Sequence, residues 1–155
     1  MADLTPYFSW VEVTRSGTAK AKGIDNSLPT PLHDSVVRTA QFMECIRALL
    51  GDKPITVNSW YRCPALNVAI GGSKSSAHMK GLAVDWEPAG MELSAAFDRV
   101  AASALPFDQL ILERTKDGAA WIHVGLSEGK PRREVLRAQG QTLGGPMSFT
   151  RVAIG

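Results

Sequence analysis

The stretch from Ser76 to Asp85, S-A-H-M-K-G-L-A-V-D, constrains this chain more than any other. It places an imidazole at His78 and a carboxylate at Asp85, which are two of the ligand types that zinc accepts. Much further along, His123 lies within an apolar run at residues 119–126 that predicts a buried strand. An unpaired imidazole is costly to bury, and a shared metal ion would account for it. We therefore predict a metal site that joins these three side chains.

The number of protein ligands predicts the kind of metal site. Two histidines and one aspartate leave the fourth position of a tetrahedral zinc ion open, which distinguishes a catalytic zinc from a closed structural one. His78 and Asp85 alone are a weak signal, but Gly81 and Ala83 between them and His123 in a W-x-H strand strengthen it. Two alternatives stay open: a closed structural zinc, and a plain buried hydrogen-bonded pair of Asp85 and His123.

A family resemblance is carried by the pattern S-x-H-x-x-G-x-A-x-D at residues 76–85, with Ser59-Trp60-Tyr61-Arg62 before it and Trp121-Ile122-His123 after it. From about Phe8 to about Leu126 the chain closely resembles the zinc D-Ala-D-Ala carboxypeptidase family, which includes phage endolysins and shares a fold with the hedgehog signalling domain. The resemblance implies that His78, Asp85 and His123 bind Zn²⁺. It also implies that the substrate is a peptidoglycan peptide and that the protein is a phage or prophage endolysin or a D,D-carboxypeptidase.

Length and composition fit one globular domain. The chain has 155 residues, of which 45% are hydrophobic and 21% are charged, and this is enough for a full core. We expect a single peptidase-like domain, with residues 1–32 as a wrapping segment and residues 127–155 as a C-terminal extension. The formal net charge of +2 is too mild to predict a nucleic-acid partner. We expect a monomer.

The sequence also bears on where the protein acts. No basic segment followed by an apolar stretch opens it, and no run of about 18 apolar residues occurs, so neither a signal peptide nor a membrane span is predicted. We expect synthesis in the cytoplasm. The family resemblance implies that a holin or a virion then brings the protein to the cell wall.

Hydrophobic periodicity predicts an α+β fold, with helices packed on one face of a small antiparallel sheet. Helices are predicted at residues 33–50, 64–70 and 93–104. Strands are predicted at residues 54–59, 81–86, 107–113 and 120–126, with a strand-like segment at 148–154. Residues 1–32 are expected to be mostly irregular and to cover the core.

Side-chain alternation along these strands predicts what the site contains. Asp85, Gln109, Glu113 and His123 should share one face of the sheet, where cross-strand neighbours lie about 4.5–5.5 Å apart at Cβ. Gly81 is expected on the same face, where it would clear room for a peptide.

Zinc-dependent hydrolysis also needs a general base. Many relatives carry an acidic residue three positions before the second ligand histidine, where this chain has Ala120. Glu113 on the predicted site face is our choice for the base, and Asp117 in the following turn is the reserve. Alternatively, Glu113 pairs with Arg114 or Lys116 at the end of its strand. The absent acid also keeps open a different function, a zinc-bearing but non-catalytic binding module of the hedgehog type.

Three further residues are candidates for substrate binding. Arg62 is expected to bind a substrate carboxylate or the oxyanion, because its guanidinium offers a fork of donors that stays charged; its alternative is to pin the turn to the core. Ser76 is expected to orient the substrate or His78, or to cap its loop. Gln109 lies on the site face. Trp60, where relatives commonly have a small residue, is expected to narrow the substrate entrance.

The remaining candidates have structural interpretations. We expect Cys45 to be a buried free thiol on the apolar face of a helix, and Cys63 to be neither nucleophile nor ligand. His33 is expected on the surface. Residues 71–76 lack the spacing of a phosphate-binding loop and are expected to let His78 approach the metal. The basic residues within 130–137 are expected to be solvated, with weak contact to an anionic wall polymer as the alternative.

Overall fold

The computed structural model describes residues 3–153. Its strands are β1 (Asp3–Thr5), β2 (Phe8–Ser9), β3 (Ile55–Ser59), β4 (Ala83–Pro88), β5 (Gln109–Thr115), β6 (Ala120–Gly125), β7 (Glu134–Gly140) and β8 (Met147–Arg151). Its helices are α1 (Trp10–Thr14), α2 (Gly17–Lys22), η1 (Thr30–Leu32), α3 (His33–Leu49), α4 (Pro64–Ile70), η2 (Ala77–Lys80) and α5 (Leu93–Ala101). None of these helices is long and apolar enough to cross a membrane.

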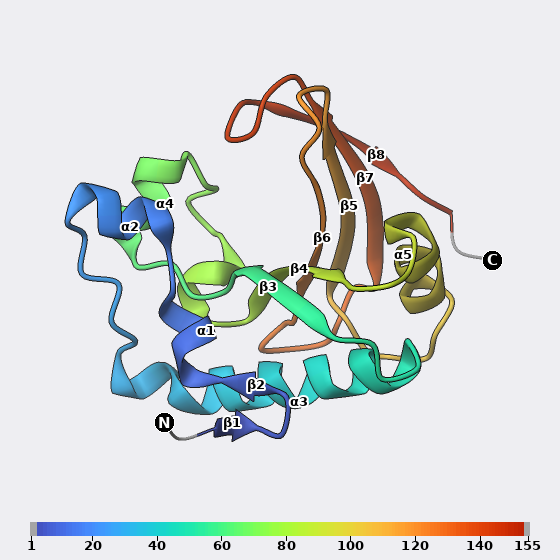
Figure 1. Ribbon diagram of the computed structural model, residues 1–155, viewed down its shortest axis with the longest axis horizontal. Coiled ribbons are helices and arrows are strands. Elements are labelled where there is room, and N and C mark those ends of the chain that lie inside the picture. The colour runs from blue at the N-terminus through green and yellow to red at the C-terminus, as the bar shows by residue number, and fades with distance from the viewer. Residues whose placement is uncertain (1–2, 154–155) are drawn as a thin grey trace.

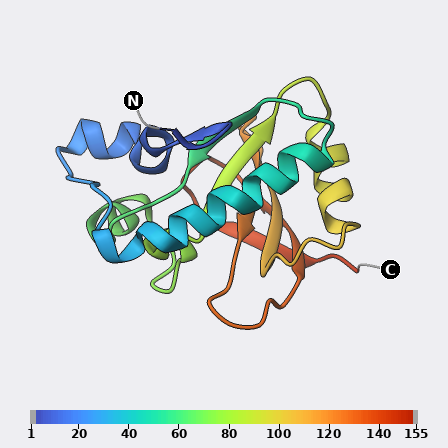
Figure 2. The same cartoon turned by 90° about the horizontal axis from the view of Figure 1, so that it is seen from below.

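The central element is a six-stranded sheet with the order β3-β4-β6-β5-β7-β8 (Figure 1). Leu110 and Leu112 of β5 and Ile122 and Val124 of β6 are at most 2% exposed and point into the core. Helix α5 contacts β4, β5 and β6, and α3 packs against α5 and runs across the sheet (Figure 2). The α+β class is therefore confirmed, and the opposite face of the sheet is free to carry a site.

One pair of strands differs from the predicted antiparallel sheet. Strands β5 and β7 are parallel, in the register Gln109 with Glu134. The loop after β6 leads past β5 to β7. At the start of β7, Glu134 N donates to Asp108 O, just before β5, at 2.9 Å. Strand β7 was not predicted, because only Val135 and Ala138 within it are fully buried and its charged residues resemble a solvated segment.

The N-terminal segment is more regular than predicted. Ser9 and Glu12 form a reciprocal capping box at the start of α1, and Ser16 caps α2. Asn26 then ties the segment to the turn before α4: its amide donates to Tyr61 O at 3.0 Å, and its carbonyl accepts from Cys63 N at 2.7 Å. These bonds hold α1 and α2 beside the elements that carry the site.

The predicted helices and strands lie where expected, with differences at their ends. Helix α4 has the predicted bounds, α3 ends one residue earlier, and α5 ends at Ala101 rather than Ala104. Strand β8 covers residues 147–151, and Ile154 lies outside the described residues. Cys45 is exposed, contrary to prediction, because the buried face of α3 is formed by Ala40, Met43 and Ile46.

Candidate metal centre

His78 is positioned by a short helical turn that its own neighbours cap. Ser76 Oγ accepts a hydrogen bond from His78 N at 3.2 Å at the start of η2. Gly81 ends the turn in the left-handed conformation with φ +71°, which favours glycine over any residue with a Cβ. The capping role of Ser76 was one of the predicted alternatives, and it orients the backbone of His78.

The turn is held from behind by buried groups. The carbonyl oxygen of Gly81 accepts from Thr39 Oγ1 of α3 at 2.9 Å and from Trp60 Nε1 at 3.2 Å. A Cβ at position 81 would lie 2.7 Å from Val36 Cγ2. Gly81 therefore precedes the strand and permits packing on α3, rather than clearing room for substrate as predicted. Trp60 is fully buried beneath the turn and does not narrow the entrance, which also corrects the prediction.

The backbone carbonyl of the same tryptophan fixes the tautomer of His78. His78 Nδ1 lies 2.6 Å from Trp60 O, and since a carbonyl only accepts, Nδ1 carries the proton. Nε2 of His78 is thereby left with a free lone pair that points toward Asp85. Orientation of a metal-binding imidazole through its other nitrogen is the usual arrangement in metal sites.

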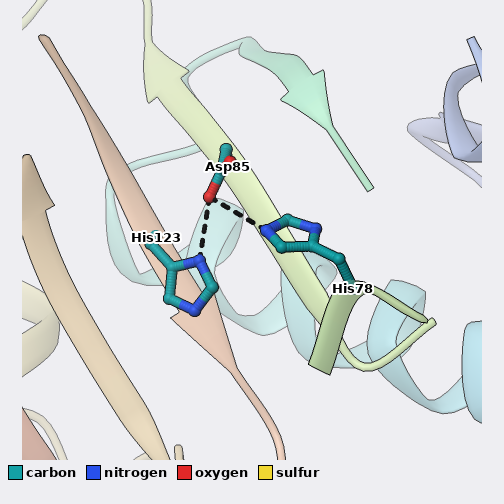
Figure 3. A group of neighbouring side chains, drawn as sticks. All are labelled: His78, Asp85 and His123. Atoms are coloured by element: carbon teal, nitrogen blue, oxygen red, sulfur yellow. Dashed lines mark hydrogen bonds and ion pairs between the residues drawn. The ribbon is translucent and has the colours of Figure 1, made fainter. Parts of the chain in front are cut away.

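Asp85 and His123 face each other across two adjacent strands. Asp85 of β4 is the register partner of His123 of β6, as alternation predicted. Asp85 Oδ1 lies 2.9 Å from His123 Nδ1 and 3.3 Å from His78 Nε2 (Figure 3). The three ligand atoms lie within 4.8 Å of one another, and no further His, Cys, Asp or Glu of residues 3–153 joins the group. A metal ion held here would keep an open coordination position.

The donor set fits a zinc ion better than a metal-free cluster. His78 Nε2 is buried and has no hydrogen-bond partner, so the alternative of a plain Asp85–His123 pair leaves one polar atom unexplained. Burial lowers the pKa of His78, which keeps it neutral as a ligand must be. Burial alone would raise the pKa of Asp85, but the two imidazoles hold it below its usual value. Two imidazole nitrogens and one carboxylate are ligands that zinc accepts.

Arg62 lies next to this cluster. Its Nη2 is 3.8 Å from Asp85 Oδ2 and its Nη1 is 3.3 Å from Asn67 Oδ1, while its Nε is buried without a partner. The backbone of Arg62 is fixed by the bond from its N to His78 O at 3.1 Å. The guanidinium is therefore held beside the ligands, with donor capacity left over.

Glu113 occupies the same face one strand away. It is the register partner of Trp121, and Trp121 Nε1 donates to Glu113 Oε2 at 2.8 Å. Burial, helped by the negative charge of Asp85, raises the pKa of Glu113 to about 7. Within the described residues Glu113 forms no ion pair with Arg114 or Lys116, so the structural alternative for this residue has no contact to support it.

Asp117, the reserve for the base, is bound elsewhere. Its carboxylate accepts from Thr115 Oγ1 and, at 3.0 Å, from Leu143 N in the turn between β7 and β8. These hydrogen bonds lower the pKa of Asp117, which makes it a weaker base than Glu113. Its position indicates that it holds the two turns together.

The other predicted residues lie as follows. Gln109 is on the site face, but its amide donates to Glu134 Oε1 at 2.8 Å. Cys63 caps α4, with its sulfur accepting from Leu66 N at 3.4 Å, which agrees with a structural role. His33 is exposed beside Trp10.

A cleft of about 1650 Å³ surrounds the three candidate metal ligands, Arg62 and Glu113. One wall is the loop between α4 and η2, and another is the turn between β7 and β8. Sequence reasoning missed the second wall, which includes Leu143, Met147 and Phe149. The run Gly144-Gly145-Pro146 between two alternating segments was the available signal for this hairpin.

Comparison with known proteins gives two matches. A family model described as Peptidase M15 matches residues 6–125. A curated relative named "Zinc D-Ala-D-Ala carboxypeptidase", from Streptomyces albus G, is 36% identical over 84 residues, which cover 54% of this chain and 32% of the relative. The chain thus aligns with about a third of the length of that relative.

Proposed function

The chain belongs to the peptidase M15 family, and on this premise we propose that it is a zinc-dependent peptidase that hydrolyses a peptide bond in peptidoglycan. The observation that carries the proposal is the convergence of His78 Nε2, Asp85 Oδ1 and His123 Nδ1, with one of these atoms buried and otherwise unpartnered. A ligand set of three, with a coordination position left open, is the arrangement of a catalytic zinc.

Each residue around the cluster has a part in such a reaction. Zinc bound at a site of this kind lowers the pKa of water from about 15.7 to roughly 7 and polarises a carbonyl group. Glu113 accepts the proton of the attacking water on Oε1, because Oε2 is bonded to Trp121, and passes it to the leaving amine. Arg62 offers its guanidinium to the oxygen that becomes negative in the transition state. Asp85 lies between the two imidazoles and is the third residue that would hold the ion.

The substrate and the biological role are finer parts of the proposal. The name of the Streptomyces relative supports a peptide that ends in D-Ala-D-Ala, although an L-Ala-D-Glu bond or a cross-link would suit the same chemistry. We place the protein as a phage or prophage endolysin or a wall-remodelling carboxypeptidase, carried to the wall by a holin or a virion.

The test is incubation of the zinc-loaded protein with peptidoglycan, followed by detection of new amino groups and mass spectrometry of the fragments. The proposal expects release that a chelator stops, and the fragment masses identify the bond. A Glu113→Gln variant should lose kcat, whereas the matched Asp117→Asn variant should keep a kcat close to that of the natural protein. Ala120 in place of the family's acid favours one rival, the non-catalytic binding module. Zinc-loaded protein that binds peptidoglycan but releases nothing would establish that rival.

A further inference from the structure

The face of the sheet that carries the metal ligands continues to its far edge. Trp121 of β6 pairs with Glu113 of β5, Glu113 pairs with Ala138 of β7, and Ala138 pairs with Phe149 of β8. Directly paired residues lie on the same face of a sheet. Phe149 therefore shares the face of the catalytic cluster, although it lies beyond the residues 6–125 that the family model matches.

This part of the face is mainly apolar, and its outermost apolar side chain is exposed. The neighbouring row leads from His123 through Ile111 and Leu136 to Arg151 at the edge of the sheet, so the apolar part of this face consists of Ile111, Leu136, Ala138 and Phe149. Phe149 is 56% exposed, and Leu143 at the tip of the hairpin is 65% exposed. Both line the same cleft as His78 and His123. Large apolar side chains left exposed beside a reactive centre indicate a binding surface.

The hairpin tip is fixed in place. Lys116 N donates to Gly140 O at 3.0 Å and Asp117 N donates to Gln141 O at 3.2 Å, so the turn after β5 is bonded along the end of β7. Asp117 also accepts from Leu143 N at 3.0 Å. Asp117 is thus a positioning residue that holds Leu143 at the rim of the cleft.

The dimensions indicate what this surface accommodates. Three strand spacings separate β6 from β8, which is roughly 14 Å, or about four residues of extended peptide. The cleft of about 1650 Å³ also exceeds the usual 300–1000 Å³ of small-molecule sites. Three residues that line this side of the cleft, Ile111, Leu143 and Phe149, carry no hydrogen-bonding side-chain atoms. Such a lining suits methyl and methylene groups better than the hydroxyl groups of a sugar.

We propose that the β7–β8 hairpin is a substrate-binding wall, in which Phe149 and Leu143 contact apolar side chains of an extended peptide arm of the substrate. This inference rests on the proposed function. In this proposal, substrate selectivity depends on the β7–β8 hairpin. The hairpin is distant from the metal ligands in sequence, but strand pairing places it on the same face of the sheet.

The test measures binding of sugar-free stem peptides, released from peptidoglycan by an amidase, to zinc-loaded protein that carries Glu113→Gln to prevent turnover. In that background Phe149→Ser and Leu143→Ser should each weaken binding about 10-fold, the loss expected when one large apolar side chain is removed from a partly buried contact. In otherwise natural protein both should raise KM and leave kcat nearly unchanged. Val68→Ser is the matched control, since Val68 is 79% exposed on α4 and does not line the cleft.

Three results would overturn the inference. The hairpin variants could bind the stem peptides as tightly as the Val68→Ser control. They could lose affinity only for muropeptides that carry sugars, in which case the occupant is glycan. Sedimentation could show a dimer that Phe149→Ser dissociates, in which case the occupant is a second copy of the chain. If natural protein releases amino groups while the variants keep its KM, only the hairpin inference fails; if zinc-loaded natural protein neither binds nor cleaves, the proposed function fails with it.

Discussion

The two ends of the six-stranded sheet differ in chemistry along one continuous face. Around β4, β5, β6 and the turn η2 it carries largely buried ionisable groups, each with a named partner: Trp60 O for His78, His123 for Asp85, Trp121 for Glu113. At β7 and β8 it carries Leu136, Ala138 and Phe149, with the ion pair of Glu134 and Arg151 beside them, and Phe149 is more than half exposed. The comparison shows that the pairing of strands in one sheet places a rigid group of ionisable residues next to an exposed binding surface.

Substitution of Asp85 should have the largest effect and should be confined to the first region. Asp85→Ala removes one of the three proposed ligands. Loss of a group that only orients a ligand costs up to about 100-fold in metal affinity, so we expect loss of a ligand itself to cost more than that. Metal analysis and calorimetric titration measure this. Phe149→Ser should bind metal like the natural protein. Full metal occupancy in Asp85→Ala would contradict the assigned ligand set.

Glu113→Gln should abolish turnover without weakening metal binding. General acid–base catalysis contributes about 10²- to 10⁴-fold, so we expect kcat to fall by that factor, because an amide cannot accept the proton. The side chain keeps its shape and can still accept the hydrogen bond from Trp121. Steady-state kinetics on the fragment identified by mass spectrometry are the measurement. Undiminished kcat would assign the base to another residue.

Two glycine substitutions, one in each region, compare how the free energy of unfolding and the metal affinity depend on that region. Gly81→Ala forces a Cβ into a left-handed backbone and against Val36, so we expect a loss of about 3 kcal/mol in the free energy of unfolding, together with weaker metal binding. In Gly140→Ala the added Cβ meets Met147 Sδ and the backbone oxygen of Pro146 in the hairpin, so we expect a loss of about 2 kcal/mol with metal affinity unchanged. Denaturant unfolding and metal titration of both proteins provide the measurement. Equal effects on metal binding would show that the two regions are not independent.

The pH dependence of stability gives a smaller effect at the first region. Because the pKa of Glu113 is raised to about 7 in the folded protein, the folded state favours its protonated form. Its contribution to stability is present below the unfolded pKa of about 4.5 and is lost as the pH rises through about 7. Metal-free Glu113→Gln should therefore exceed metal-free natural protein by about 2 kcal/mol at pH 8 and match it at pH 4. Urea unfolding at both pH values measures this, and a difference that grows toward low pH would contradict it.

The smallest effect is expected at the surface contact between η2 and the loop after β6. Lys80 Nζ lies 2.9 Å from Glu128 Oε1, and both side chains are more than half exposed. Lys80→Ala should change the free energy of unfolding by less than about 1 kcal/mol. A larger loss, measured by denaturant unfolding, would mean that this loop is more tightly coupled to the metal-binding turn than its hydrogen bonds indicate.

The same two regions differ in how far the sequence could predict them. His78, Asp85 and His123 could be placed because ligand types, spacing and strand alternation all indicate one face, and Glu113 followed from the same alternation. Gly144-Gly145-Pro146 indicates the hairpin turn, but the position of the hairpin beside the site could not be predicted, because parallel pairing of β7 with β5 depends on the path of residues 126–133, which no local pattern indicates. Gly81 and Trp60 were assigned to the substrate side because sequence cannot tell which neighbour a small or a large side chain meets. Gly81 packs toward Val36 of α3 instead, and Trp60 lies in the core, where it contacts Phe8 and donates to Gly81 O.

One carbonyl group has a consequence for how the protein handles its ion. The carbonyl oxygen of Gly81 accepts hydrogen bonds from Thr39 of α3 and from Trp60. The turn that carries His78 therefore adopts its conformation when the polypeptide folds. The conformational entropy of ordering that imidazole is lost at that stage and not at the moment of coordination. Removal of the ion should therefore leave the turn folded, and the metal-free protein should bind the ion again without refolding.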